Sequence, residues 1–151
     1  MDNWDTINAV QRMQSYIEAH LNEPITLGML AKAAGYSPWH AAKTFKALVG
    51  KSPFEYIRAV RLSRAAVRLR DEEVKIVDVA FDFVFDSHEG FTRAFSKAFG
   101  MTPRRYSQTK APIKLFIPGH IRDIYLALHK GEVKMSETLK SSTIFVQVVE
   151  R

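Results

Sequence analysis

Two clusters of residues, about fifty positions apart, have side chains suited to contacting the edges of DNA base pairs. The first cluster is Trp39, Ala42 and Lys43, and the second is His88, Glu89, Gly90 and Arg93. Lysine and arginine donate to guanine O6 and N7, a carboxylate accepts from cytosine N4, and apolar groups contact the thymine methyl. We therefore predict that both clusters read bases in double-stranded DNA.

The individual residues differ in how specific their predicted contacts are. Arg93 is the best candidate, because a bidentate guanidinium on guanine is the commonest specific contact. Lys43 suits guanine or a phosphate, and Trp39 either contacts a thymine methyl or packs on its own domain. Glu89 either accepts from cytosine or, if Asp86 begins the helix, completes a cap.

Gly90 costs about 1 kcal/mol of helix propensity within its helix. Either close approach of the backbone to DNA or close helix packing would explain it.

A second group of residues is predicted to contact phosphates rather than bases. It consists of Ser37, Lys46, Arg61 and Thr92. Arg61 begins a row with Arg64 and Arg68 at positions i, i+3 and i+7, which places the three on one side of a helix. A row of this kind is also typical of a solvated helix face.

The two reading clusters lie in two copies of one structural unit. Residues 45–56 and 95–106 share the pattern Phe-x-x-x-x-Gly-x-Ser/Thr-Pro-x-x-Tyr. Upstream of this pattern the copies also correspond, except that the second has one extra residue at Asp86. Each copy fits a short helix, a turn and a second helix, so one helix-turn-helix unit is predicted twice.

Apolar spacing and capping residues predict the helices that position these clusters. The expected helices span residues 4–21, 26–34, 37–49, 52–70, 76–80, 87–99 and 102–106, with a further one at 121–128. The two modules occupy about 26–49 and 75–99 of a DNA-binding domain at 4–108. Helix 52–70 joins them; at about 27 Å plus its flanking turns it is close to the ~34 Å between successive major-groove segments on one face of DNA.

The C-terminal part has a different character. Residues 109–142 read as a linker with one short helix, and the β-branched run at 143–149 reads as a strand. Because an isolated strand is not stable in water, we expect the chain to be a fragment whose sheet continues in a missing domain, or the strand to be contributed to another chain.

Composition excludes several classes of function. The 151-residue chain has a net charge of +6, which favours a polyanionic partner, and no Cys, which excludes thiolate chemistry and the acceptor thiol of an alkyl-transfer repair enzyme. The five His residues lack metal-site spacing, and no nucleophile elbow or phosphate loop is present. We expect no enzyme activity, metal or cofactor, no membrane span, and a cytoplasmic, nucleoid-associated location.

The segments 30–40 and 91–106 resemble the AraC/XylS family of bacterial transcription regulators, in particular its MarA/SoxS/Rob-like branch. The resemblance implies an all-α fold of seven helices with two helix-turn-helix modules, RNA polymerase as a partner, and a small-molecule effector bound by a C-terminal domain that would begin at 143–151. One departure concerns Val84, where the family usually has Gly. A β-branched residue resists positive φ, so we expect the extra Asp86 to reshape this turn.

These observations predict a sequence-specific DNA-binding transcription regulator, an activator that reads two adjacent major-groove segments of an asymmetric promoter site. The alternative is an architectural or silencing protein that relies on phosphate contacts without strong sequence preference.

Overall fold

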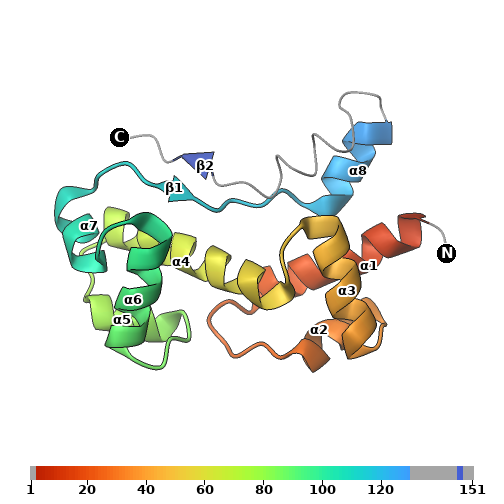
Figure 1. Ribbon diagram of the computed structural model, residues 1–151, viewed down its shortest axis with the longest axis horizontal. Coiled ribbons are helices and arrows are strands. Elements are labelled where there is room, and N and C mark those ends of the chain that lie inside the picture. Colours follow the sequence, from red (N-terminus) through yellow and green to blue (C-terminus); the bar gives the residue numbers. More distant parts are fainter. Residues whose placement is uncertain (1–2, 130–145, 148–151) are drawn as a thin grey trace. The chain divides into compact units, whose positions relative to one another are not determined.

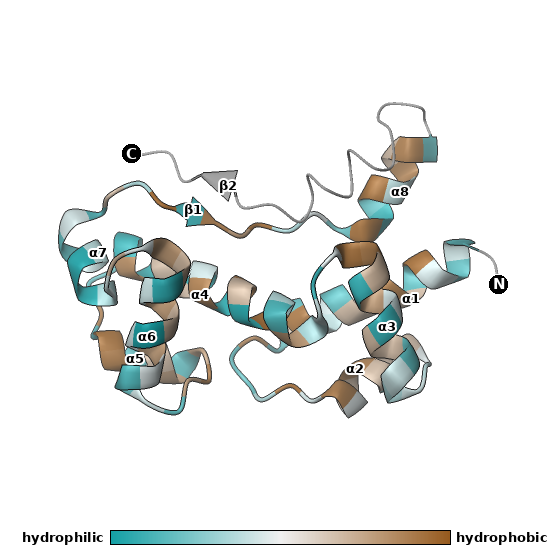
Figure 2. Ribbon diagram, in the orientation of Figure 1, coloured by the Kyte–Doolittle hydropathy of each residue, from teal (hydrophilic) through white to brown (hydrophobic). Residues whose placement is uncertain are grey.

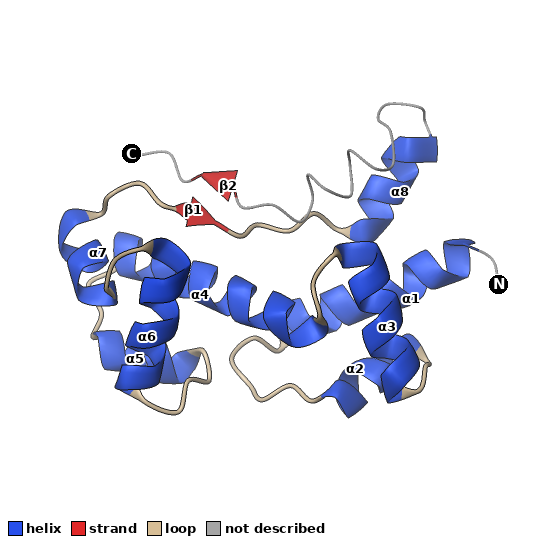
Figure 3. Cartoon of the chain, in the orientation of Figure 1, coloured by secondary structure: helices blue, strands red, loops and turns tan. Residues whose placement is uncertain are grey.

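The computed structural model describes residues 3–129 and 146–147. This part of the chain is helical apart from its loops and two short strands, which confirms the all-α prediction (Figure 3). It divides into two compact units. The first contains residues 3–20, 24–57 and 118–129, and the second contains residues 21–23, 58–117 and 146–147. None of the helices in the described ranges is both long and apolar enough to cross a lipid bilayer.

The first unit is built around its N-terminal helix (Figure 1). It comprises α1 (Asn3–Ala19), α2 (Leu27–Ala34), α3 (Pro38–Val49), the beginning of α4 (Pro53–Asp71), and α8 (Ile121–His129). Helix α1 packs against α2, α3 and α8, and its apolar residues Val10, Met13 and Ile17 are fully buried. All these helix bounds lie within two residues of those predicted.

Capping residues begin α2, α3 and α4 as the sequence indicates. Thr26 and Ser37 accept hydrogen bonds from backbone N–H groups in the first turns of α2 and α3. Ser52 and Glu55 form a reciprocal capping box at α4, with Ser52 N donating to Glu55 Oε1 at 3.0 Å and Glu55 N to Ser52 Oγ at 3.3 Å. The bond from the Ser52 backbone lowers the pKa of the Glu55 carboxyl.

The second unit is held together by aromatic side chains. It contains the rest of α4, α5 (Ile76–Asp82), α6 (His88–Phe99), α7 (Pro103–Thr109), β1 (Lys114–Leu115) and β2 (Val146–Gln147). The rings of Phe91, Phe95 and Phe99 follow one another along α6, with centroids 5.7 and 4.7 Å apart. Tyr106 of α7 lies 5.9 Å from Phe95. In Figure 2, hydrophilic and hydrophobic residues alternate along α6, as one buried face requires.

The region predicted as a linker is partly packed. Ile113, Leu115 and Phe116 are buried, and Phe116 N donates to the buried Ser63 hydroxyl at 2.8 Å. The predicted strand is present at Val146–Gln147, but the expectation that its partner lies outside the chain is wrong for these two residues. They pair in antiparallel fashion with β1, which the sequence analysis did not anticipate. The other residues of 143–151 lie outside the described residues.

A smaller correction concerns the buried face of α3. The apolar spacing within residues 37–49 predicts Leu48 in the core, whereas Val49 is buried there and Leu48 is only half-buried. A shift of one residue rotates the contact by about 100° around the helix, which spacing alone does not resolve near a helix end.

The turn before α6 keeps the geometry of the turn before α3 despite its different sequence. Val84 has φ 67°, close to the 75° of Gly35. Both turns also share a hydrogen-bond pattern, in which Gly35 N donates to Lys32 O and Val84 N donates to Phe81 O. The expectation that Asp86 reshapes the turn at this point is therefore wrong. Asp86 lengthens the loop further on, and Val84 adopts a conformation that disfavours β-branched residues.

This strain gives a prediction about stability. Gly at position 84 should make the protein more stable than Ala there by roughly 0.5–1 kcal/mol, because an L-residue in the left-handed region costs about 1–2 kcal/mol and the larger unfolded-state entropy of Gly offsets part of that. Urea unfolding of Val84→Gly and Val84→Ala measures the difference.

Gly35→Ala is the matched control, because a Cβ there would meet no other atom within 4 Å. It should destabilise the protein through conformation alone. If Val84→Ala proves more stable than Val84→Gly, as at an ordinary helical position, position 84 is not strained.

Candidate nucleic-acid interface

The buried face of α3 determines which of its residues are exposed. Ala41 and Phe45 are fully buried, and the Phe45 ring contacts Tyr56 edge-on at 5.1 Å between centroids. With this side of the helix held inside the first unit, the opposite side is free to contact a ligand.

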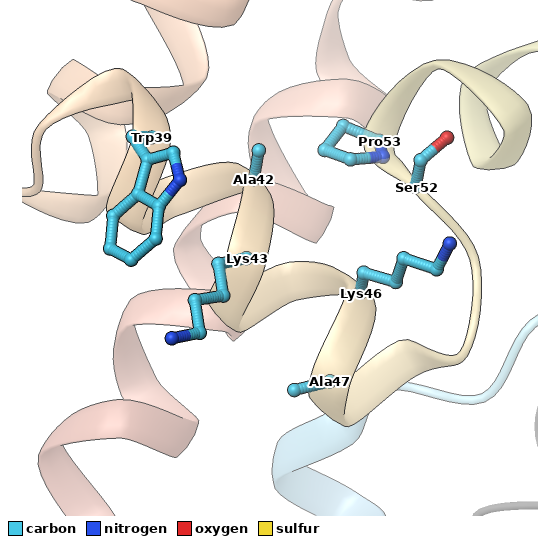
Figure 4. A pocket seen from close by; sticks show the side chains of 7 residues that line it. All are labelled: Trp39, Ala42, Lys43, Lys46, Ala47, Ser52 and Pro53. Carbon is cyan, nitrogen blue, oxygen red and sulfur yellow. The ribbon is translucent and has the colours of Figure 1, made fainter.

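The exposed face of α3 brings together four of the predicted DNA-contacting residues. Trp39 is 70% exposed, Lys43 and Lys46 are exposed, and Ala42 lies half-buried between them. They line an open depression whose other wall is Ser52 and Pro53 at the start of α4 (Figure 4). An exposure of 70% is inconsistent with Trp39 packing on its own domain.

Trp39 and Lys43 contact each other on this face. The Lys43 ammonium lies 4.7 Å from the centroid of the Trp39 ring. A cation–π contact at an exposed site contributes about 0.5–1 kcal/mol, enough to reduce the motion of a flexible lysine. The pair thus presents an indole N–H, an apolar ring and a positive charge one helical turn apart, which is the chemistry that a major-groove edge requires.

The start of α6 differs from one of the two predicted alternatives. Ser87 is the N-cap, and its hydroxyl accepts from Gly90 N at 3.0 Å. Glu89 is therefore the second residue of the helix, one position short of the third position that a capping box requires. The capping explanation for Glu89 is wrong, and its exposed carboxylate is free of that role.

The same cap bears on Gly90. A Cβ added at Gly90 would lie 3.1 Å from Ser87 Oγ, which is a tight contact. In the first module the corresponding cap, Ser37, accepts from His40, which does carry a Cβ. The two caps differ in backbone conformation, with φ −68° at Ser37 and −150° at Ser87. The tight contact with Ser87 therefore explains Gly90 locally. This explanation requires neither helix packing nor contact with DNA.

The exposed face of α6 repeats the layout of α3 with different residues. Arg93, His88 and Glu89 are exposed, and Thr92 is half-buried. His88 and Thr92 line an open depression with Thr102 and Arg104 at the start of α7. Arg104 was missed by the sequence analysis, although the repeat pattern offers a signal: this exposed cation takes the place that Phe54 has in the first copy.

The arginine row of α4 is largely used within the protein. Arg61 donates through Nε to Leu21 O at 3.1 Å and through one terminal nitrogen to Glu23 O at 2.6 Å. Burial lowers the pKa of Arg61. Arg68 pairs with Asp82 at 2.7 Å. These contacts give both arginines structural roles. We therefore do not propose Arg61 as a phosphate contact.

Two other arginines of α4 are exposed. Arg64 is the remaining member of the predicted row. Arg58, which the sequence analysis did not name, has its guanidinium carbon 5.8 Å from the centroid of the Phe85 ring, in the turn before α6. Across residues 3–129 and 146–147, no group of three or more His, Asp or Glu side chains is arranged to hold a metal ion.

Comparison with known proteins identifies the family of this chain. Residues 30–109 match the family model described as a helix-turn-helix domain. Right origin-binding protein of Escherichia coli (strain K12) is 41% identical over 105 residues, covering 70% of this chain and 36% of that protein. Regulatory protein SoxS of Salmonella typhimurium is 36% identical over 97 residues, covering 64% of this chain and 91% of SoxS. The chain thus spans about a third of the origin-binding protein and nearly all of SoxS.

Solved structures agree on the fold. An AraC-type transcriptional regulator from Chromobacterium violaceum superposes with a TM-score of 0.65 at 27% identity, covering 69% of this chain and 93% of that one. The DNA-binding domain of AdpA, solved in complex with a target DNA, gives 0.62 at 22% identity over 66% of this chain and 89% of that one. Together with the repeated modules, these matches establish that the chain belongs to the AraC-type family of helix-turn-helix DNA-binding regulators.

Proposed function

We propose that this protein activates transcription by reading two adjacent major-groove segments of an asymmetric promoter site, with α3 in one segment and α6 in the other. The supporting observation is that the two helices share their buried positions and differ at their exposed ones. Phe45 and Phe95 are both fully buried, whereas Trp39 corresponds to Glu89 and Ala42 to Thr92. Unlike reading surfaces on like scaffolds suit two unlike half-sites.

Base reading on α3 falls to the Trp39–Lys43 pair. Lys43 donates to guanine O6 or N7, and Trp39 contacts a thymine methyl, with Ala42 small enough to let the helix approach. On α6, Arg93 donates to guanine and Glu89 accepts from cytosine N4, a role for which its release from capping is favourable. His88 and Gly90 complete the surface that faces the bases.

Phosphate contacts frame each of the reading helices. Ser37, Lys46 and Thr92 keep this proposed role, and Arg104 joins them because it is exposed beside Thr92 and His88. Such contacts fix the register of a protein on DNA without carrying sequence information.

The wider role belongs to the same proposal. RNA polymerase would be the partner in activation, and a small-molecule effector would act through a domain that follows the described residues. The location would be the cytoplasm, at the nucleoid. The alternative, an architectural or silencing protein, draws its support from the net charge of +6, which favours any duplex.

Selection of bound sites from random duplexes tests the proposal against this alternative. We expect an asymmetric consensus with two unlike segments about one helical turn apart, because the exposed residues of the two modules differ. Recovery of no consensus, with affinity that depends only on salt, would favour the architectural role.

Arg93→Ala tests base reading by the second module. It should weaken binding to the selected duplex by about 1–3 kcal/mol and leave binding to random duplex nearly unchanged, because a bidentate guanine contact is lost. Fluorescence anisotropy measures both affinities. Lys97→Ala removes another exposed cation from the same helix. It should weaken binding to both duplexes equally or to neither. Equal losses on both duplexes for Arg93→Ala would contradict base reading by this residue.

Arg104→Ala tests the added phosphate contact. It should weaken binding to selected and random duplexes alike and reduce the slope of log affinity against log salt by about 1, because one phosphate interaction is removed. Arg105→Ala is the matched control: Arg105 is the next residue, also exposed, and it does not line the depression with Thr92. An unchanged salt slope for Arg104→Ala would remove Arg104 from the interface.

A further inference from the structure

A buried glutamine in α1 connects three separate segments of the first unit. Gln14 is 1% exposed. Its Nε2 donates to the Tyr56 hydroxyl at 3.2 Å and to Gly119 O at 3.1 Å, and its Oε1 accepts from Ile121 N at 2.8 Å. A buried amide is costly unless its hydrogen bonds are made. Two of these three partners lie beyond residue 109, where the match to the family model ends.

Other side chains of α1 hold the same segment. The first N–H groups of a helix have no acceptor within that helix. Here side chains of α1 supply acceptors for the first N–H groups of α8. Gln11 Oε1 accepts from Arg122 N at 3.0 Å, and Asn8 Oδ1 accepts from Arg122 Nε at 3.0 Å. His120 Nε2 lies 2.7 Å from Glu18 Oε1. Side chains of α1 thus hold the segment 118–122 through hydrogen bonds and the Glu18–His120 contact.

On its other side, Gln14 contacts Tyr56 of α4, which packs against the proposed reading helix α3. The Tyr56 hydroxyl that it contacts belongs to the ring that packs edge-on against Phe45, at an interplanar angle of 83°. Phe45 is fully buried and lies on the face of α3 opposite Lys43. A shift of Tyr56 is therefore transmitted to α3, because a close-packed core has no free space to absorb it.

We propose that the segment 118–129 is a positioning element of the first reading module, and that Gln14 is the positioning residue through which it acts on α3. The inference rests on α3 being a reading helix, as proposed above. Because such coupling is reciprocal, DNA bound at α3 must stabilise the docked segment by the same factor by which the docked segment favours DNA binding.

The primary measurement uses the unmodified full chain. Amide hydrogen exchange at Ile121 and Arg122 is followed by NMR with and without the selected duplex. Exchange at these amides should slow severalfold when the duplex binds, since local opening of the segment becomes less favourable. Exchange that is unchanged by the duplex overturns the proposal without any variant.

Gln14→Leu then tests the connecting residue. It keeps a side chain of similar size and removes all three hydrogen bonds. We expect exchange at Ile121 to become about 3- to 10-fold faster, affinity for the selected duplex to fall about 3- to 10-fold, and the slowing by duplex to disappear. Affinity within twofold of the unmodified chain, or slowing that persists in the variant, overturns the role of Gln14.

Arg12→Ala is the matched control for a general loss of stability. Arg12 also lies on α1, but it donates to Ala33 O and Ala34 O at the end of α2. The Arg12→Ala variant should therefore still show slower amide exchange at Ile121 when the duplex binds, even if its affinity for the duplex falls. Lys43→Ala separates the two proposals: unchanged affinity for this variant contradicts reading by α3, whereas a loss for Lys43→Ala without a loss for Gln14→Leu contradicts only the positioning role.

Discussion

The contact between a phenylalanine of each proposed reading helix and a tyrosine of the helix that follows it determines what this protein can present to DNA. The ring centroids of Phe45 and Tyr56 lie 5.1 Å apart, and those of Phe95 and Tyr106 lie 5.9 Å apart. All four side chains are almost completely buried. Each pair fixes the rotation of its reading helix about its own axis. Once that rotation is set, the 3.6-residue period decides which positions are exposed, including Lys43 and Arg93.

This constraint explains why the two copies diverge where they do. Substitution at Phe45 or Phe95 would cost several kcal/mol of packing, whereas substitution on the exposed face costs little stability. Selection on binding can therefore act on exposed residues while the scaffold is kept. The turns behave similarly, because Val84 is held in the same left-handed conformation as Gly35 in spite of its side chain. The surrounding hydrogen bonds over-determine the turn and override the local preference.

The sequence predicted the fold well because its signals were local. Proline at the first turn, glycine after the last and serine or threonine at the cap placed the helix ends to within three residues. The repeated Phe-to-Tyr spacing placed the modules. The exposure of Trp39, Lys43 and Arg93 also followed from spacing, because whatever a periodic helix does not bury it must expose.

Contacts between residues distant in the sequence could not be predicted in this way. Arg61 looked like one member of a basic row, yet it donates to carbonyls forty residues earlier in the chain. The choice between Asp86 and Ser87 as cap was equally open, since both residues are good N-caps and only the backbone conformation decides. The pairing of β1 with β2 was missed because two residues of strand carry no periodic signal.

Gln14 shows the same limit and has a larger consequence. In the sequence it is one of two glutamines, with Gln11, beside the apolar residues of α1, where exposure would be the usual expectation. In the structure it is buried and its amide is shared between Tyr56, which packs on α3, and the backbone of Gly119 and Ile121. The limit of the family match at residue 109 is therefore not the limit of packing, which continues through α8. A chain cut at 109 would leave the buried amide of Gln14 without two of its partners, so the packed unit around α1 includes the segment that follows the family match.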